Sequence, residues 1–266
     1  MHVRALLIVM AMALAARTAT AQPAIPLLVE GEWLSQHLND RGVVVLHTGR
    51  DYATRHIPGA RELQGTVTVA QLAALGVSDD SRIVVYGVGE EIPAMLMFAL
   101  DELGFGERAS LLNGGLIAWT KAGRPVTSQA TAMTPGKLTA PPTRNLIVDA
   151  EFVKSIPQRA NHRLVDARAP VFYQGIEGMH GKAGHIPGAV NIPHGDVATG
   201  VLDRDRLARM FGDAGIKPGD TVVAYCHIGQ YARWVLFAAR VLGHPVRLYG
   251  GSFHDWTMND RGPVTK

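Results

Sequence analysis

The chain contains a single cysteine, Cys226, and its position is typical of a reactive group. It directly follows a short apolar run at 222–225 and precedes a stretch at 231–242 with apolar residues at helical spacing. Because α/β sheets bind ligands at the carboxyl ends of parallel strands, we expect Cys226 to lie in such a site. Loop N–H groups and the start of the following helix would favour an anion there, which points to a nucleophilic thiolate or its persulfide. A buried structural thiol is the competing interpretation.

The residues after Cys226 complete a candidate anion-binding loop. Gly229 permits a tight turn. A protonated His227 would help to hold an anion, although a solvent-facing side chain explains this histidine equally well. With Cys226 as the catalytic residue, the sequence predicts a substrate-binding loop made of His227, Ile228, Gly229, Gln230, Tyr231, Ala232 and Arg233.

Other chemistries fit these residues less well. A cysteine-dependent phosphatase needs an arginine at position 232 to clamp phosphate, but this chain has Ala232, and Arg233 comes one residue late. The 11 histidines are scattered without a metal-binding spacing. We therefore predict no metal and no other cofactor.

Length and composition indicate a folded α/β protein. The 266 residues suffice for one large or two ordinary domains, and 47% of them are hydrophobic and 18% charged. A single cysteine excludes an intrachain disulfide and a cysteine-based zinc site. The formal charge of +3 becomes +1 without Arg4 and Arg17, so no nucleic-acid partner is implied.

The first 21 residues have the pattern of a cleavable signal peptide. A basic start at 1–4 precedes an apolar run at 5–16, and small residues at 19–21 suit cleavage before Gln22. The apolar run is shorter than the roughly 20 residues that span a bilayer, which disfavours the alternative of a membrane anchor. We expect a periplasmic or secreted protein without a membrane span in the mature chain.

A repeated pentapeptide indicates an internal duplication. The sequence His-Ile-Pro-Gly-Ala occurs at 56–60 and again at 185–189. The Thr-, Ala- and Pro-rich segment 128–143 separates the two halves and is predicted to be a linker. This division leaves an N-terminal domain at 22–127 and a C-terminal domain at 144–266.

Each half alternates short apolar runs with amphipathic stretches, as in a mostly parallel sheet flanked by helices. Strands are expected at 43–46, 82–86, 164–166, 222–225 and 246–249. Helices are expected at 93–103 and 231–242, with Gly104 and Gly243 after them. Residues expected in the core or in turns before strands are Trp119, Trp234, Trp256, His56 and His185.

The first half has no counterpart of the thiol loop. The corresponding segment runs from Gly87 to Glu91 and contains no cysteine. Its carboxylates, Glu90 and Glu91, oppose anion binding. The N-terminal domain is therefore predicted to be a non-catalytic scaffold.

These motifs resemble the tandem-domain rhodanese sulfurtransferases over nearly the whole mature chain. The resemblance rests on the two His-Ile-Pro-Gly-Ala segments, the loop after Cys226, the triplet 166–168 and the closing segment 248–256. It implies two rhodanese-like α/β domains, of which the second takes sulfane sulfur from a donor onto Cys226 and passes it on. The order Cys-His-x-Gly is similar to that of secreted bacterial rhodaneses.

The resemblance also implies further site residues and a donor. Asp166 and Arg168 belong to the implied substrate site, where Arg168 either contacts substrate or pairs with a carboxylate such as Asp166. Many thiosulfate and mercaptopyruvate enzymes of the family carry a second arginine where this chain has Phe172. We expect thiosulfate as donor and cyanide or a thiol as acceptor, and the sequence names no protein partner. A non-catalytic persulfide relay or partner-binding module is the alternative.

Overall fold

The computed structural model describes residues 26–87, 91–199 and 201–266. The predicted signal peptide, residues 1–21, lies outside this part of the chain. The first domain contains the strands β1 (Leu28–Val29), β2 (Val43–Thr48), β3 (Arg61–Glu62), β4 (Arg82–Gly87) and β5 (Ala109–Leu112). Its helices are α1 (Gly31–His37), α2 (Val69–Ala74), α3 (Glu91–Glu102), the 3-10 turn Gly106–Arg108 and α4 (Gly115–Lys121).

The second domain repeats this arrangement with a few additions. Its main strands are β6 (Ile147–Val148), β7 (His162–Asp166), β10 (Val190–Asn191), β11 (Thr221–Tyr225) and β12 (Val246–Tyr249). A hairpin adds β8 (Gly178–Met179) and β9 (Lys182–Ala183). The helices are α5 (Ala150–Lys154), the 3-10 turn Ile156–Gln158, α6 (Pro170–Tyr173), α7 (His194–Ala198), α8 (Arg204–Asp213), α9 (Ala232–Leu242) and α10 (Ser252–Met258).

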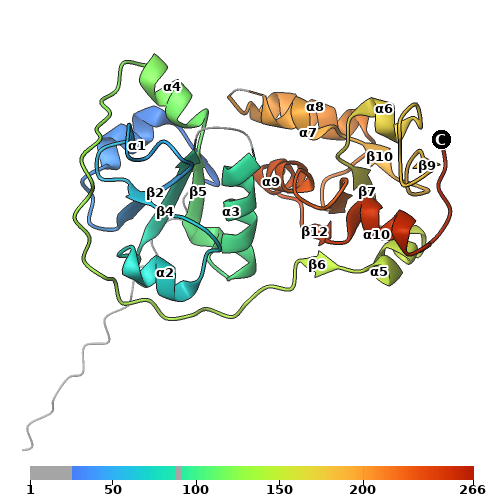
Figure 1. Ribbon diagram of the computed structural model, residues 1–266, viewed down its shortest axis with the longest axis horizontal. Coiled ribbons are helices and arrows are strands. Elements are labelled where there is room, and N and C mark those ends of the chain that lie inside the picture. The colour runs from blue at the N-terminus through green and yellow to red at the C-terminus, as the bar shows by residue number, and fades with distance from the viewer. Residues whose placement is uncertain (1–25, 88–90, 200) are drawn as a thin grey trace, which may run out of the picture.

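The two main sheets have the same topology. Their strand orders are β1-β5-β4-β2-β3 and, read in the same direction, β6-β12-β11-β7-β10. All strand pairings within these two sheets are parallel among the described residues. The predicted α/β fold of two mostly parallel sheets flanked by helices is therefore confirmed (Figure 1).

Equivalent side chains make equivalent hydrogen bonds in the two halves. The hydroxyl of Tyr86 accepts a bond from the Ile57 N–H at 2.9 Å, and that of Tyr225 accepts one from the Ile186 N–H at 3.0 Å. Each bond ties the end of a central strand to the His-Ile-Pro-Gly-Ala turn. The two halves that repeat in the sequence therefore also repeat the same side-chain contact in the structure.

The two repeated histidines hold the turns in place, as predicted. The ring Nδ1 of His56 lies 2.7 Å from the carbonyl of Tyr52, and that of His185 lies 2.8 Å from the carbonyl of Tyr173. Both rings stack on the same tyrosine that they contact, with centroids 3.9 and 3.8 Å apart. Each histidine also forms a short antiparallel bridge, to Thr127 and Thr265 respectively.

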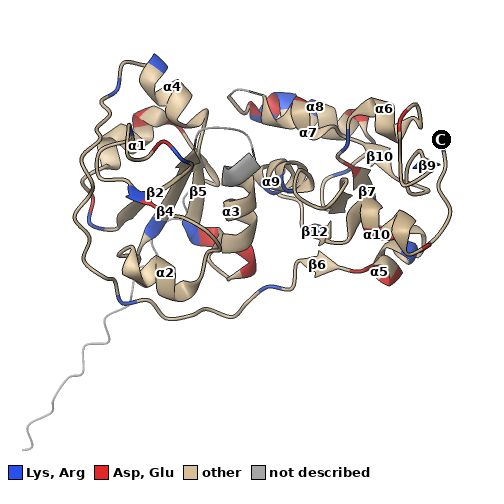
Figure 2. Ribbon diagram, viewed as in Figure 1, with Lys and Arg blue, Asp and Glu red and all other residues tan. Residues whose placement is uncertain are grey.

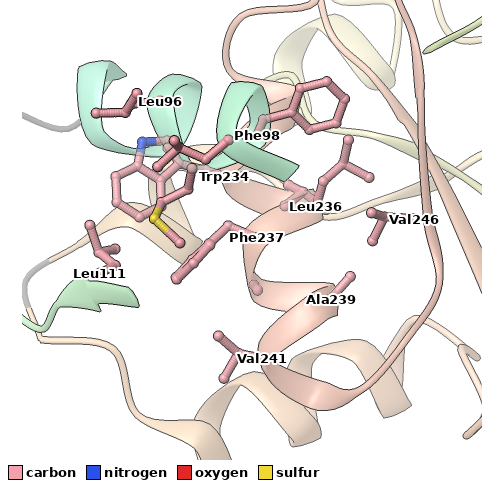
Figure 3. Close-up of a cluster of buried hydrophobic side chains, with 14 of the residues drawn as sticks. Leu96, Phe98, Leu111, Trp234, Leu236, Phe237, Ala239, Val241 and Val246 are labelled. Carbon is pink, nitrogen blue, oxygen red and sulfur yellow. The ribbon is translucent and has the colours of Figure 1, made fainter. Parts of the chain in front are cut away.

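The hydrophobic core continues from one domain into the other. Helices α3 and α9 pack against each other between the two sheets, and their apolar side chains join those of both sheets in one cluster (Figures 1 and 3). A smaller cluster covers the outer face of each sheet, one in the first domain and one in the second. The three predicted core tryptophans are buried: Trp119, Trp234 and Trp256.

A buried carboxylate adds a polar contact to this interface. Asp101, at the end of α3, is fully buried and lies 3.2 Å from Nε of Arg240 on α9 and 2.6 Å from Nη1 of Arg144. Burial lowers the pKa of Arg240, but the neighbouring carboxylate of Asp101 opposes that shift. The two domains therefore meet through both apolar packing and an ion-paired cluster.

The segment 128–143 contains no helix or strand and runs along the outside of the first domain (Figure 1). It is hydrogen-bonded to that domain along its length. The carbonyl of Gln129 lies 3.1 Å from His56 Nε2, the Gly136 N–H donates to the Ala73 carbonyl, and the Thr139 N–H donates to Asp79. The segment between the two domains is therefore an extended connection that is hydrogen-bonded to the first domain.

Charged residues of both signs are interspersed in both domains, as α8 illustrates in Figure 2. None of the helices in the described part of the chain is long and apolar enough to cross a membrane.

Candidate active site

Cys226 lies at the carboxyl end of β11, as the sequence predicted, and its side chain is fully buried. Its sulfur accepts a hydrogen bond from the Gly229 N–H at 3.2 Å. Gly229 has a φ of +85°, a backbone conformation that disfavours residues with a side chain. The turn thus points a backbone donor at the sulfur, while α9 begins at Ala232 and directs its N-terminus to the same end of the sheet.

Ser252, the first residue of α10, fixes the backbone of the cysteine. Its hydroxyl accepts from the Cys226 N–H at 3.3 Å and donates to the Tyr249 carbonyl at 2.9 Å. Ser252 has a φ of +55°, which is uncommon for a residue other than glycine. The sequence analysis missed this role, although the repeat contains a signal, since the equivalent position in the first domain is Gly115 with a φ of +53°.

The start of α10 fastens the thiol loop further. The Phe253 N–H donates to the Cys226 carbonyl at 3.0 Å, and the His254 N–H donates to the His227 carbonyl at 2.9 Å. These bonds leave the loop little freedom to reorient around the sulfur. The carbonyls of Cys226 and His227 are thereby directed at the start of α10.

Asp166 and Arg168 form a buried ion pair beneath this loop. Arg168 Nη2 lies 2.5 Å from Asp166 Oδ2, and Arg168 Nε lies 3.0 Å from Asp166 Oδ1. The same guanidinium donates to the Gly184 carbonyl at 2.7 Å and lies over the Phe253 ring, 3.8 Å from its centroid. With only 1% of its side chain exposed, Arg168 has the geometry of a structural ion pair, one of the two roles considered from the sequence.

His227 is half-buried and does not simply face solvent. Its ring meets the Phe172 ring edge-on, with centroids 4.6 Å apart. Burial lowers the pKa of His227, and the nearby Arg168 acts in the same direction. The neutral ring is therefore favoured, which weakens the expectation that a protonated His227 holds an anion.

Arg233 points back to the loop from the first turn of α9. Its Nη1 donates to the Gly229 carbonyl, and its guanidinium lies over the Phe98 ring of α3, 5.1 Å from the centroid. Burial lowers the pKa of Arg233, whereas the nearby Glu102 carboxylate opposes that shift. Because Arg233 is bonded to the outside of the loop, it does not clamp an anion in the manner of a phosphatase arginine.

The remaining loop residues form the rim of the site. Ile228 is 55% exposed and Gln230 is exposed, whereas Ala232 is buried at the start of α9. The Tyr231 ring stacks on the His194 ring at a centroid distance of 4.2 Å. The structure thus brings the predicted loop residues together around Cys226, with Asp166 and Arg168 behind them.

A cavity of about 640 Å³ adjoins this region on the side of the first domain. Arg233 lines it together with Phe98 and Glu102 of α3 and with Arg50 and Glu62 from the carboxyl ends of β2 and β3. Burial raises the pKa of Glu102, and Arg233 opposes that shift. The cavity offers charged groups of both signs within reach of the loop. No cluster of three or more metal-ligating side chains occurs among the described residues.

The first domain lacks room for an equivalent thiol. In the strand register, Gly87 takes the place of Cys226, since Tyr86 corresponds to Tyr225. A Cβ atom at Gly87 would lie 2.4 Å from the Thr48 carbonyl oxygen and 2.6 Å from the Thr48 hydroxyl. Of the predicted acidic pair, Glu90 lies outside the described residues and Glu91 begins α3.

Comparison with known proteins agrees with this architecture. Residues 30–122 and 149–259 each match the family described as Rhodanese-like domain. A probable 3-mercaptopyruvate sulfurtransferase of Pseudomonas aeruginosa is 30% identical, with 89% of this chain and 97% of that protein covered. A thiosulfate sulfurtransferase of Rattus norvegicus is also 30% identical, with 78% and 79% covered.

A solved structure shows the same fold. The crystal structure of SseA, a 3-mercaptopyruvate sulfurtransferase from Escherichia coli, superposes with a TM-score of 0.70 at 23% identity, covering 86% of this chain and 99% of SseA. The duplicated parallel sheets, the two matched ranges and these relatives together place the chain in the rhodanese family, as a protein with two rhodanese-like domains in tandem.

Proposed function

We propose that the protein is a thiosulfate sulfurtransferase whose second domain carries sulfur as a persulfide on Cys226. The observation that carries this proposal is a lone thiol at the carboxyl end of a parallel strand, with the Gly229 N–H directed at its sulfur. Relatives named as sulfurtransferases over most of their length support the reaction class.

The proposed reaction has two displacement steps. The Cys226 thiolate attacks the outer sulfur of thiosulfate, the sulfur–sulfur bond of the donor breaks, and sulfite leaves with the bonding electron pair. The enzyme then holds a persulfide. A thiophilic acceptor such as cyanide attacks the outer sulfur of that persulfide, which releases thiocyanate and regenerates the thiolate.

In the proposed reaction, the residues around Cys226 stabilise the developing negative charge and hold the thiol and its loop in position. The Gly229 N–H and the N-terminus of α9 favour negative charge on the inner sulfur and on the departing sulfite. Arg233 adds positive charge to the loop and holds the Gly229 carbonyl, and Ser252 holds the Cys226 N–H. In this proposal the Asp166–Arg168 ion pair supports the loop through Phe253, because the Arg168 guanidinium packs on the Phe253 ring.

Thiosulfate is expected to be a better donor than mercaptopyruvate. A planar carboxylate is best gripped by an arginine in bidentate fashion, and Phe172 occupies the position where many relatives carry that arginine. Phe172 contacts His227, directly after the cysteine, so an arginine there could reach the site. Losing one charge-assisted contact costs roughly 1.5–3 kcal/mol, or about one to two decades in kcat/KM. Steady-state rates with both donors, and with an aryl phosphate as the phosphatase substrate, test the proposal.

The matched variant is Phe172→Arg, which should raise kcat/KM for mercaptopyruvate more than for thiosulfate. Phe172→Leu serves as its control, because it removes the ring without adding a charge. A wild-type preference for mercaptopyruvate would refute the donor assignment while leaving sulfur transfer intact. Aryl phosphate hydrolysis without thiocyanate formation would refute sulfur transfer itself.

We propose that the first domain is a scaffold without sulfur-transfer activity. Introducing a thiol by Gly87→Cys in a Cys226→Ser background should restore no thiocyanate formation, because the backbone and hydroxyl of Thr48 occupy the space beside position 87. Gly87→Ala in the same background controls for the added Cβ atom. Recovery of turnover by the cysteine variant would contradict the scaffold assignment.

We also propose that residues 1–21 are a cleaved signal peptide and that the mature protein is periplasmic or secreted. Protein purified from its native host should begin at Gln22, because small residues precede that position. Intact-mass measurement of the purified chain identifies its first residue, with a loss of ammonia if the terminal glutamine has cyclised. A membrane-bound protein that retains residues 1–21 would contradict the proposal.

A further inference from the structure

The cavity of about 640 Å³ beside the thiol loop is larger than the proposed reaction needs. Thiosulfate and cyanide are ions of only a few atoms, whereas cavities of roughly 300–1,000 Å³ hold much larger ligands. The lining residues lie in the segments 48–50, 62–67 and 95–102 and at Arg233, and none of them is next to a residue outside the described ranges. Cys226 and residues 227–232 do not line it. The space can therefore hold a second molecule.

Two carboxylates in the cavity have free acceptor oxygens. Glu62 ends β3, Glu102 ends α3, and both side chains are half-buried. Neither carboxylate forms a side-chain hydrogen bond or a salt bridge with a described residue, yet neither has an oxygen that is closed off from solvent. Burial raises the pKa of Glu102. A cation bound beside this carboxylate would stabilise its charged form.

Two guanidinium groups line the same cavity. Arg233 donates from Nη1 to the Gly229 carbonyl, but its Nε and Nη2 have no partner among the described residues and remain accessible to solvent. The Nε and Nη2 edge is the one with which Arg168 holds the Asp166 carboxylate. Arg50, which follows β2, is exposed. These groups suit a carboxylate on a ligand, because a guanidinium binds a carboxylate through paired N–H groups.

Apolar side chains form part of the cavity wall. Leu63, Val67, Leu96 and Phe98 line it and are only 5% to 8% exposed. Leu96 and Phe98 project from α3 beside α9 (Figure 3), and the Arg233 guanidinium lies over the Phe98 ring. An apolar group between the charged ends of a ligand would bury surface against these side chains.

The cavity holds four charged side chains that do not neutralise one another: Arg50, Glu62, Glu102 and Arg233. In the described part of the chain none of them forms a salt bridge, although Arg233 and Glu102 each oppose the pKa shift of the other. A simple anion would be repelled by the two carboxylates, and a simple cation by the two guanidiniums. A molecule with both an ammonium and a carboxylate group is attracted by both pairs.

We propose that this cavity binds a short peptide with free ends and an apolar side chain between them. Glu62 and Glu102 hold its ammonium group. Arg50 and the free edge of Arg233 hold its carboxylate. Binding needs no sulfur chemistry, so the site does not depend on the proposed sulfurtransferase function. Through Arg233 the peptide contacts the residue that holds the Gly229 carbonyl, next to the thiol.

The test is calorimetric titration of the full-length protein with the peptide glycyl-leucyl-glycine. We expect one site per chain and the same affinity in Cys226→Ser, which removes sulfur transfer but no cavity residue. Acetylating the amino end or amidating the carboxyl end of the peptide should each weaken binding by about threefold or more, because each change removes one charged contact. The peptide blocked at both ends should not bind measurably.

Variants of the protein assign each end of the peptide to its partners. In Glu62→Gln/Glu102→Gln, the free peptide should bind about threefold or more weakly, and acetylation should then cost little further affinity. In Arg50→Gln, amidation should cost less than in the wild type, because one of the two guanidiniums is already gone. Arg233 is left unchanged in this test, since it also holds the Gly229 carbonyl.

The matched controls are Glu177→Gln and Arg41→Gln, two exposed side chains outside the cavity that should leave binding unchanged. Thermal unfolding identifies any variant that is not folded, and Arg50→Gln with the amidated peptide carries the test if the double variant does not fold. Three results would overturn the proposal: no saturable binding, equal binding of the fully blocked peptide, or a cost of blocking each end that stays the same in the variants.

Discussion

Incubation with thiosulfate is expected to add one sulfur atom to each chain, and Cys226→Ser is expected to add none. Cys226 is the chain's single cysteine, so no other side chain can form a persulfide. A serine hydroxyl in the same place is a much weaker nucleophile toward sulfur and cannot form the intermediate. Intact-mass measurement should show the loss of the adduct, and thiocyanate formation should fall by roughly a thousandfold or more.

The matched control for this variant is Ser252→Ala. It removes the hydroxyl that holds the Cys226 N–H but leaves the thiol, so sulfur addition should persist at a reduced rate. A serine variant that turns over at the wild-type rate would refute covalent catalysis. A mass gain on Cys226 without turnover of small donors would instead assign the protein to the persulfide relay considered from the sequence.

The sequence was sufficient for the central strands and for the fold class. Apolar runs at 43–46, 82–86 and 222–225 grow by only one or two residues in the structure, because buried parallel strands need continuous apolar residues. The two-residue strands at the sheet edges were not predicted. A strand that short has no periodicity to detect, and only its pairing partner defines it.

The environment of the thiol could be predicted only in part. Its place at the end of a strand and the turn at Gly229 followed from local sequence, and both are present. The contact of Ser252 with the Cys226 N–H joins the start of α10 to the loop after β11, and the lowered pKa of His227 follows from its burial in the folded protein, where it packs beside Phe172. Such contacts across the fold leave no local pattern in a single sequence.

Breaking the ion pair beneath the loop is expected to destabilise the whole second domain. In Arg168→Met the carboxylate of Asp166, which is fully buried, keeps the Arg168 backbone N–H at 2.9 Å but loses its counter-charge. Removing one partner of a buried pair costs about 3–5 kcal/mol, because the remaining charge is left in a poorly solvating interior. For a chain of this size the loss corresponds to a fall in Tm of roughly 6–20 °C. Thermal unfolding monitored by circular dichroism measures it.

The double variant Asp166→Leu/Arg168→Met separates a structural role from substrate contact. It removes both charges, so much of the lost stability should return, since a buried pair replaced by apolar residues is often close to neutral. If Arg168 acts only through the fold, the KM for thiosulfate in the double variant should stay near the wild-type value. Only kcat should fall, because the thiol loop is held less firmly once the guanidinium no longer packs on Phe253. A Tm change of less than a few degrees in Arg168→Met, combined with a large rise in KM, would show that Arg168 binds the substrate directly. That outcome would require the guanidinium to leave the Asp166 carboxylate and the Phe253 ring, against which it is now packed.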